Sequence, residues 1–437
     1  MTIKYYAIRL SILLTAAGSL VGQNWPEYRG PTREGISNTT GLPLHWSETD
    51  NVKWKTAIHD QGWSSPVVYE NQVWLTTATE DGKALYVILI DRDTGKILLD
   101  RQLFSVDIPR PLGNGVNSYA SPSPVIEEGR VFLHFGSYGT ACIDTGTFEI
   151  IWERRDLPCD HWRGPASSPV IWEDFLFLHM DGADVQYVAA LDKNTGKNRW
   201  ITFRSADYGD LGDDGRPSQS GDWRKAFSTP RVIQFKGKHQ LVSPSARAVY
   251  GYDPRTGQEI WQARHKGHSS APRTLYSNGL AGIFTGHIGA ISEMWGVRVD
   301  GLGDITESHV VWRYRRGVPK RSSPVLVDGR IYMVSNSGVL TCLDFKTGRE
   351  IWKGRIRGRY SSSIVYAEGR IHLFSEEGVT TILRPGDKFD ILARNELDSG
   401  FMASAAISDS AFFLRTKTHL YRIEKQEPKE TTKGILP

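Results

Sequence analysis

One sequence unit recurs eight times along this 437-residue chain. Each copy opens with a small residue, usually followed by proline, ahead of a β-rich run. Between Pro66 and Ala405 the openings take seven steps, about 48 residues each, which is the size of a four-stranded propeller blade. Eight copies therefore predict eight blades. The openings are Ser65-Pro66, Ser123-Pro124, Ser168-Pro169, Thr229-Pro230, Ala271-Pro272 and Ser323-Pro324, with degenerate copies at Ile364 and Ala405.

A second signal closes the unit: an aspartate, a Thr-Gly pair and a tryptophan eight residues after the aspartate, as in Asp192, Thr195, Gly196 and Trp200. Aspartate and glycine favour a hairpin turn, which places the tryptophan on the outer strand. We expect these tryptophans to be buried in the wedges between blades, as structural residues. They are Trp54, Trp152, Trp200, Trp261, Trp312 and Trp352. The fifth copy keeps Asp300 and Trp312 around a four-residue insertion at Gly301 to Asp304.

The last copy ends at His419 to Ile423 without an outer strand of its own. The segment Asn51 to Ile58 has the pattern and the tryptophan of an outer strand, although it precedes the first unit. Pairing this segment with the last blade would remove an exposed sheet edge. The predicted fold is all-β: an eight-bladed β-propeller of four-stranded antiparallel blades, closed by an N-terminal strand that joins the last blade.

The Ala-x-Asp-x-x-Thr-Gly-x-x-x-Trp frame around Asp192 resembles the repeat of pyrroloquinoline-quinone-type (PQQ-type) propellers. Quinoprotein alcohol dehydrogenases and outer-membrane assembly factors of the BamB type share this repeat. The N-terminal segment Asn24 to Pro31 resembles the opening of exported PQQ-binding-like propellers of planctomycete-type bacteria. The resemblance covers nearly the whole chain, and it implies a fold rather than a bound cofactor.

The N-terminus carries Lys4 and Arg9 around a short apolar run, which ends in small residues near Gly22. This pattern predicts a signal peptide over residues 1–22. An uncleaved anchor is the alternative, although the apolar run is short for a membrane span. We expect one propeller over residues 23–424 with a lead-in over 23–62, a disordered tail over 425–437, no membrane span in the mature chain, and a periplasmic or secreted location.

Charge and cysteine content limit the function classes. The chain has 53 basic and 49 acidic residues, a near balance that argues against nucleic-acid binding. Three cysteines are too few for a disulfide framework. Cys142 and Cys342 occupy the same repeat position, so we expect both to be buried and unpaired. We also expect a monomer.

The candidate ligand site lies on the face where the loops from one blade's outer strand to the next blade's inner strand gather around the channel. We call these the inter-blade loops. Their aromatic, cationic and polar residues suit a polar or anionic ligand or an exported protein partner, whose identity stays open. Blade packing or turn capping is the alternative role for each one. The candidates are Trp63, Asn117, Tyr119, His161, Arg163, Lys225, His268, Arg321 and Tyr360, with Asp181 and Glu376 from loops inside the blades.

No common hydrolase or nucleotide-binding motif occurs in the chain. Related quinoprotein dehydrogenases carry adjacent cysteines, which are absent here. We therefore expect no cofactor and no metal site, and a binding module without evident catalysis. PQQ with calcium is the alternative cofactor, with Asn117, Asp181, Asp184 and Glu376 as candidate oxygen ligands. The competing functions are a PQQ- and calcium-dependent oxidoreductase and an outer-membrane assembly scaffold of the BamB type.

Overall fold

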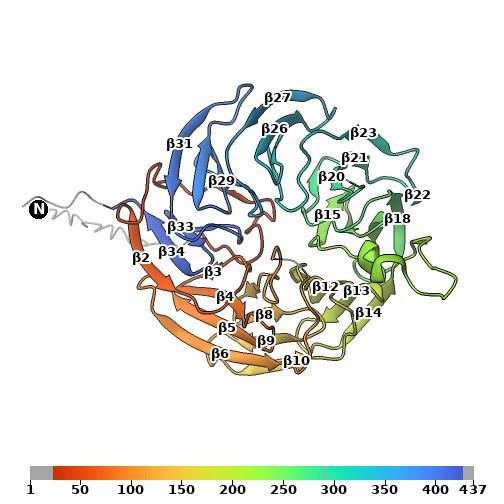
Figure 1. The fold of residues 1–437 in the computed structure, drawn as a ribbon, viewed down its shortest axis with the longest axis horizontal. Helices are drawn as coiled ribbons and strands as arrows, with labels where there is room; N and C mark the ends of the chain where they lie inside the picture. The colour runs from red at the N-terminus through yellow and green to blue at the C-terminus, as the bar shows by residue number, and fades with distance from the viewer. Residues whose placement is uncertain (1–22, 114, 290, 427–437) are drawn as a thin grey trace, which may run out of the picture.

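Eight β-sheets surround a central axis in the computed structural model, which describes residues 23–426 apart from 114 and 290 (Figure 1). Each blade has four antiparallel strands arranged one after another from the axis outwards, as the repeat predicts, and two of the eight sheets carry a short fifth strand. The predicted signal peptide lies outside the described residues, as does the tail after Gln426. The one helix described is the 3₁₀ helix η1 (Ser218–Arg224). No helix in the described part of the chain is long and apolar enough to cross a membrane.

The strands of the first four blades follow the chain order from the axis outwards. Blade one holds β3 (Val67–Tyr69), β4 (Gln72–Ala78), β5 (Ala84–Asp91) and β6 (Ile97–Ser105). Blade two holds β7 (Val125–Glu127), β8 (Arg130–His134), β9 (Thr140–Asp144) and β10 (Ile150–Arg154). Blade three holds β11 (Val170–Trp172), β12 (Phe175–Asp181), β13 (Gln186–Asp192) and β14 (Asn198–Phe203). Blade four holds β15 (Arg231–Phe235), β16 (Lys238–Pro244), β17 (Ala248–Tyr252) and β18 (Glu259–Arg264).

The next four blades include the one that closes the ring. Blade five holds β19 (Leu275–Ser277), β20 (Leu280–Phe284), β21 (Met294–Arg298) and β23 (Val310–Tyr314). Blade six holds β24 (Val325–Val327), β25 (Arg330–Val334), β26 (Val339–Asp344) and β27 (Glu350–Arg355). Blade seven holds β28 (Val365–Ala367), β29 (Arg370–Phe374), β30 (Val379–Leu383) and β31 (Ile391–Glu396). Blade eight holds β32 (Ala406–Ser408), β33 (Ala411–Arg415), β34 (His419–Glu424) and, outermost, β2 (Val52–Ala57).

The N-terminal strand closes the ring as predicted. β2 pairs antiparallel with β34, and the register places Trp54 opposite Arg422 and Ala57 opposite His419. The ends of the propeller are therefore joined by backbone hydrogen bonds, and β2 covers the edge of β34 as the outer strand of the last blade. Gln426 continues this contact, since its backbone N–H donates to Asn51 Oδ1 at 3.0 Å.

Two short strands were not predicted, and one repeat boundary was wrong. β1 (Ile36–Ser37) pairs parallel with β28, and β22 (Gly303–Asp304), formed by the insertion of blade five, pairs parallel with β18. In blade five the residue equivalent to the small opening residue is Arg273, two positions before Leu275, rather than Ala271. The predicted boundary was placed at Pro272 because proline follows the opening residue in the other copies, but Pro272 lies in the inter-blade loop.

Five repeat tryptophans fasten one blade to the next. Each indole N–H donates to a backbone carbonyl in the hairpin turn of the following blade. Trp152, for example, donates to Lys193 O at 2.9 Å, and its ring covers Gly196. The other four pairs are Trp54 with Arg92 O, Trp200 with Pro254 O, Trp312 with Phe345 O and Trp352 with Gly386 O.

Burial of the tryptophans differs from the expectation at three positions. Trp54, Trp261 and Trp312 are buried, whereas Trp152, Trp200 and Trp352 are partly exposed, since an outer strand faces solvent on one side. Trp261 is the exception in its contacts, because its indole N–H donates to Gln240 Oε1 within its own blade. It also lies beside Gly303 of β22, which replaces the usual turn.

Cys142 and Cys342 occupy equivalent places, as expected. Cys142 faces Phe132 and Trp152 on its neighbouring strands, and Cys342 faces Tyr332 and Trp352. All three cysteines are free and buried. Burial raises the pKa of Cys142 and of Cys342 to about 12, so both thiols stay protonated and unreactive.

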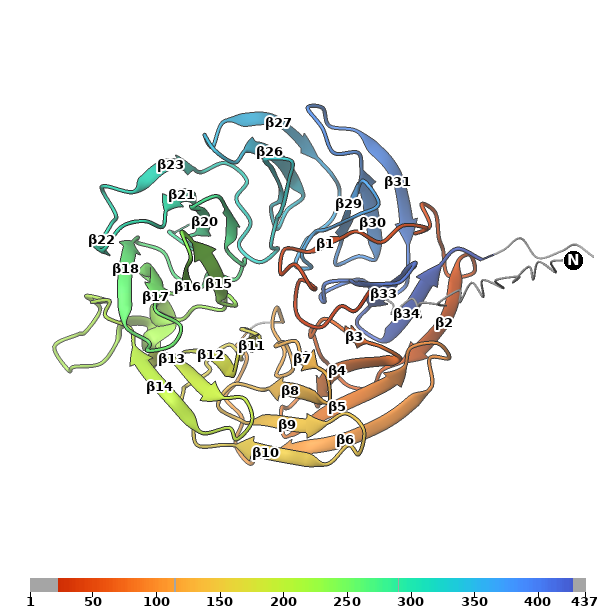
Figure 2. The same ribbon diagram turned by 180° about the vertical axis from the view of Figure 1, so that it is seen from behind.

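The first part of the predicted lead-in lies in the channel between the inner strands. Trp25 exchanges backbone hydrogen bonds with Val68 of blade one, Pro26 O accepts from Ile126 N of blade two, and Gly35 O accepts from Tyr366 N of blade seven. Figure 2 shows the N-terminal segment, in red, running inwards to the centre of the ring before it returns to β2. One mouth of the channel is therefore closed by the chain itself.

A matched pair of glycines tests the docking of tryptophan on the turn. Both have positive φ, +69° at Gly196 and +77° at Gly129, but an added Cβ would lie 2.7 Å from the Trp152 ring only at Gly196. Gly129→Ala carries only the backbone cost, about 1–2 kcal/mol. We expect Gly196→Ala to lower the free energy of unfolding by about 1–3 kcal/mol more, the usual cost of overpacking. Chemical denaturation measures both, and equal losses would contradict the docking.

Candidate functional site

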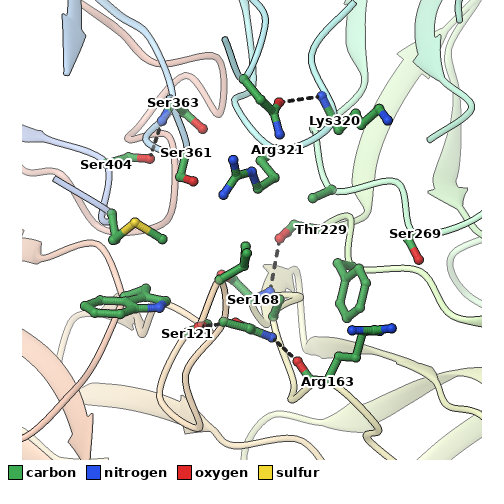
Figure 3. Close-up of a pocket in the computed structure, with 18 of the residues that line it drawn as sticks. Ser121, Arg163, Ser168, Thr229, Ser269, Lys320, Arg321, Ser361, Ser363 and Ser404 are labelled. Carbon is green, nitrogen blue, oxygen red and sulfur yellow. Dashed lines mark hydrogen bonds between the residues drawn. The ribbon is translucent and has the colours of Figure 1, made fainter. Parts of the chain in front are cut away.

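A pocket of about 550 Å³ lies on the propeller axis, at the end of the channel where the inter-blade loops gather. All eight blades and the lead-in contribute residues to its wall. Figure 3 shows Arg321 reaching towards the middle of the pocket, with Ser361, Ser363 and Ser404 on one side and Ser168 and Thr229 below. The side chains that bear on its chemistry are Tyr28, Trp63, Asn117, Arg163, Asp222, Phe227, His268, His287, Lys320, Arg321, Asn336 and Met402, together with the hydroxyl residues described next.

Seven hydroxyl residues form a ring around the axis at the openings of the blades. In most blades the backbone N–H of the ring residue donates to the hydroxyl of the ring residue in the next blade, as Ser123 N does to Ser168 Oγ at 2.9 Å. The eighth position is held by Arg273, whose N–H still donates to Ser323 Oγ at 3.0 Å. We call the set the serine ring: Ser65, Ser123, Ser168, Thr229, Ser323, Ser363 and Ser404.

Tyr28 of the lead-in forms the floor of the pocket. Its hydroxyl lies 3.0 Å from Ser323 Oγ and 2.8 Å from Ser363 Oγ, so it is hydrogen-bonded to two members of the serine ring. Arg273 holds the segment from below, because its guanidinium donates to Tyr28 O at 2.9 Å and lies against Glu27. The blind end of the pocket therefore depends on a residue far away in sequence from the blades it contacts.

Three cations line the pocket, against one carboxylate. Asp222 accepts from Arg163 Nε at 2.8 Å, which pairs that arginine at the rim. Arg321 lies 3.2 Å from Glu376, a nearly buried carboxylate just behind the wall. Lys320 has no carboxylate partner among the described residues and donates instead to His287 Nδ1 at 3.0 Å. Burial lowers the pKa of Lys320 and of Arg321.

Two stacked histidines complete this side of the wall. The rings of His268 and His287 lie 5.8 Å apart. Burial lowers the pKa of both, and the nearby Lys320 ammonium helps to bring that of His287 to about 4. Both rings are therefore neutral near pH 7, and His287 can accept the hydrogen bond from Lys320.

The structure brings only some of the predicted ligand-binding residues to the pocket. Five candidates line the pocket and six do not. Trp63, Asn117, Arg163, His268 and Arg321 line it. Tyr119, His161, Asp181, Lys225, Tyr360 and Glu376 do not.

Structural contacts hold most of the second group. Tyr119 and Tyr360 donate their hydroxyls to Arg110 O and Arg357 O in loops. Asp181 is fully buried and paired with Arg204, and although burial alone would raise its pKa, Arg204 and His179 hold it at about 2.

Two buried groups behind the wall have free polar atoms. Lys225 lies against the ring of Phe227, and its Nζ has no hydrogen-bond partner among the described residues. Burial lowers the pKa of Lys225. His161 Nε2 is likewise unpaired within the described chain, and burial keeps its pKa far below the usual value.

Sequence reasoning missed the serine ring and Tyr28 as parts of the site. The small residue that opens most copies of the repeat is the ring residue, but the sequence analysis interpreted it only as the start of a blade. Tyr28 belongs to a segment whose sequence indicated only a resemblance to exported propellers.

Residues 245–388 match the PQQ-type family model described as outer membrane protein assembly factor BamB. BamB of Yersinia pestis is 24% identical over 215 residues, which cover 39% of this chain and 52% of that protein. The match thus spans about half the length of this curated relative. The chain is an eight-bladed propeller whose residues 245–388 match PQQ-type repeats.

Solved structures show the same fold. Quinohemoprotein alcohol dehydrogenase from Comamonas testosteroni has a TM-score of 0.65 at 10% identity, over 95% of this chain and 82% of that one. BamB from Moraxella catarrhalis has a TM-score of 0.56 at 12% identity, over 85% and 99%. At such identities the likeness concerns the fold alone.

The donor set of the pocket does not fit a quinone held by calcium. Calcium requires six or more oxygen ligands, usually with several carboxylates. Asp222 is the one carboxylate on the pocket wall, and Arg163 already occupies it. Asp181, Asp184 and Glu376, proposed as ligands from the sequence, do not line the pocket, and within the described ranges no group of three acidic, histidine or cysteine residues could hold a metal ion.

The pKa of His287 tests the contact between this ring and Lys320 on the pocket wall. We expect its ring to titrate near pH 4 in a nuclear magnetic resonance titration, because burial and Lys320 disfavour the charged form. Lys320→Met should raise this pKa towards 6.5, whereas Lys320→Arg should leave it low. Because the unfolded chain takes up this proton at a higher pH, the free energy of unfolding should fall as the pH drops from about 6.5 to about 4. A midpoint near 6.5 in the native protein would refute the described contact.

Proposed function

We propose that this PQQ-repeat propeller is a non-catalytic binding module that takes an anionic ligand in its axial pocket. The excess of cations on the pocket wall carries the proposal: Arg163, Lys320 and Arg321 face one carboxylate, Asp222. With both histidines neutral, the wall has a net positive charge at pH 7. The volume of about 550 Å³ suits a small molecule rather than a folded domain.

The three cations attract an anion more strongly in this concave pocket than they would on an open surface. Arg163 lies in the loop before blade three, whereas Lys320 and Arg321 lie together in the loop before blade six, and all three converge on one concavity with a closed floor. Low-dielectric walls strengthen their attraction for an anion, and salt screens it. Binding should therefore weaken as ionic strength rises.

A protein-binding scaffold is the second candidate, favoured by the sequence match to outer membrane protein assembly factor BamB. An export signal at the N-terminus would place either kind of module outside the cytoplasm. The scaffold would use the rim of the inter-blade loops, where Trp223 is exposed, rather than the pocket interior.

Arginine variants test the anion proposal. We expect Arg163→Ala and Arg321→Ala each to weaken binding of citrate, sulfate or phosphate, and the double variant to weaken it about tenfold or more, since charge-assisted hydrogen bonds are among the strong ones. Isothermal titration at low and high salt measures this. Arg255→Ala, which removes an exposed arginine paired with Glu173 on a hairpin turn, is the matched control.

Two outcomes would overturn the proposal. Unchanged anion affinity in the double variant, with the fold intact by circular dichroism, would move the site elsewhere. Uptake of PQQ with Ca²⁺, seen as a change in the quinone absorbance, would favour the oxidoreductase instead.

A further inference from the structure

Several hydroxyl groups of the serine ring have no acceptor for their proton among the described residues. Each ring hydroxyl accepts a backbone N–H from the neighbouring blade, which uses one of its lone pairs but not its proton. Ser323 and Ser363 share hydrogen bonds with Tyr28. For the other five, no acceptor of the hydroxyl proton is found among the described residues. These five are Ser65, Ser123, Ser168, Thr229 and Ser404.

These five hydroxyls face the pocket and little else. All five line it, and none is more than 7% exposed. A buried hydroxyl without an acceptor is costly, because it has lost its hydrogen bonds to water. The pocket is the space in which an acceptor can reach them.

Other groups on the wall add to the excess of donors. Trp63 Nε1 is buried and has no partner within the described chain. Arg321 extends its guanidinium towards the middle of the pocket (Figure 3). Acceptors are already used: Asn117 Oδ1 accepts from Ser118 N, Asn336 Oδ1 accepts from Lys320 N, and Asp222 is paired.

We propose that the pocket binds a sulfate or phosphate monoester, with its tetrahedral oxyanion on the serine ring and Arg321 and its organic part against Trp63, Phe227 and Met402. This inference rests on the proposed binding of anions. An ester oxyanion offers three terminal oxygens and donates no hydrogen bond when fully ionised. A planar carboxylate offers two oxygens, which match donors from several blades less well.

Phenyl sulfate, phenyl phosphate and benzoate are the probes, with binding measured by isothermal titration at low salt. We expect both esters to bind more tightly than benzoate. The double variant Ser123→Ala and Ser168→Ala should weaken ester binding about tenfold or more, since it removes hydrogen bonds to a charged group. The ring tolerates a missing hydroxyl, because Arg273 already occupies one position.

Neighbouring residues supply the controls. Ser167 Oγ is buried and unpaired among the described residues but does not line the pocket, so Ser167→Ala should leave ester affinity unchanged. Ser168→Thr keeps the hydroxyl, as Thr229 does in the next blade, and should keep affinity within about twofold. Circular dichroism and thermal unfolding confirm that each variant folds.

The outcomes separate this inference from the proposed function. Ester affinity that survives in the double serine variant but falls in Arg321→Ala overturns the role of the ring and leaves anion binding in place. Benzoate binding more tightly than both esters overturns the tetrahedral oxyanion. If none of the three anions binds the native protein, the proposed function itself fails. If one ester alone loses affinity in the serine variant, the ring is confirmed and that ester is the ligand class.

Discussion

Contact between successive blades is the constraint on which this propeller depends. A blade of four strands has two faces, and neither is covered until the next blade packs on it. At the outer edge the contact is made by a tryptophan that donates to a turn carbonyl and covers a glycine, as Trp152 does over Lys193 and Gly196. The glycine and the tryptophan of the repeat therefore belong to one interaction between neighbours, although the sequence presents them within one unit.

At the inner edge, the serine ring makes the contact between neighbouring blades. A hydroxyl close to the axis is small enough for eight blades to converge, and it accepts the backbone N–H of the neighbouring blade. This arrangement leaves five hydroxyl donors without an acceptor among the described residues, on the wall of one shared pocket. The pocket is thus a consequence of how the ring closes, while its charge comes from Arg163, Lys320 and Arg321 in loops that carry no repeat signal.

The repeat made the fold predictable, down to the pairing of Trp54 with the last blade, because blade spacing and turn chemistry are local in sequence. The site was less predictable. Inter-blade loops could be assigned to one face, which brought Arg163, His268 and Arg321 into the candidate set. Nothing local distinguishes them from Tyr119 or Tyr360, whose side chains turn away to satisfy loop carbonyls. The path of the lead-in, and with it Tyr28, depends on contacts across hundreds of residues.

Blade five shows how a departure from the repeat can serve the whole ring. Its ring position is Arg273 instead of a hydroxyl residue, and that side chain reaches the lead-in at Tyr28 O and Glu27. A serine there could not span the distance to the plugging segment. The backbone N–H of Arg273 still donates to Ser323, so the contact between blades is kept while the side chain is free for a second task. Burial of this guanidinium is costly and lowers its pKa to about 10, which Glu27 partly offsets. The floor of the pocket therefore depends on the one position at which the serine ring is broken.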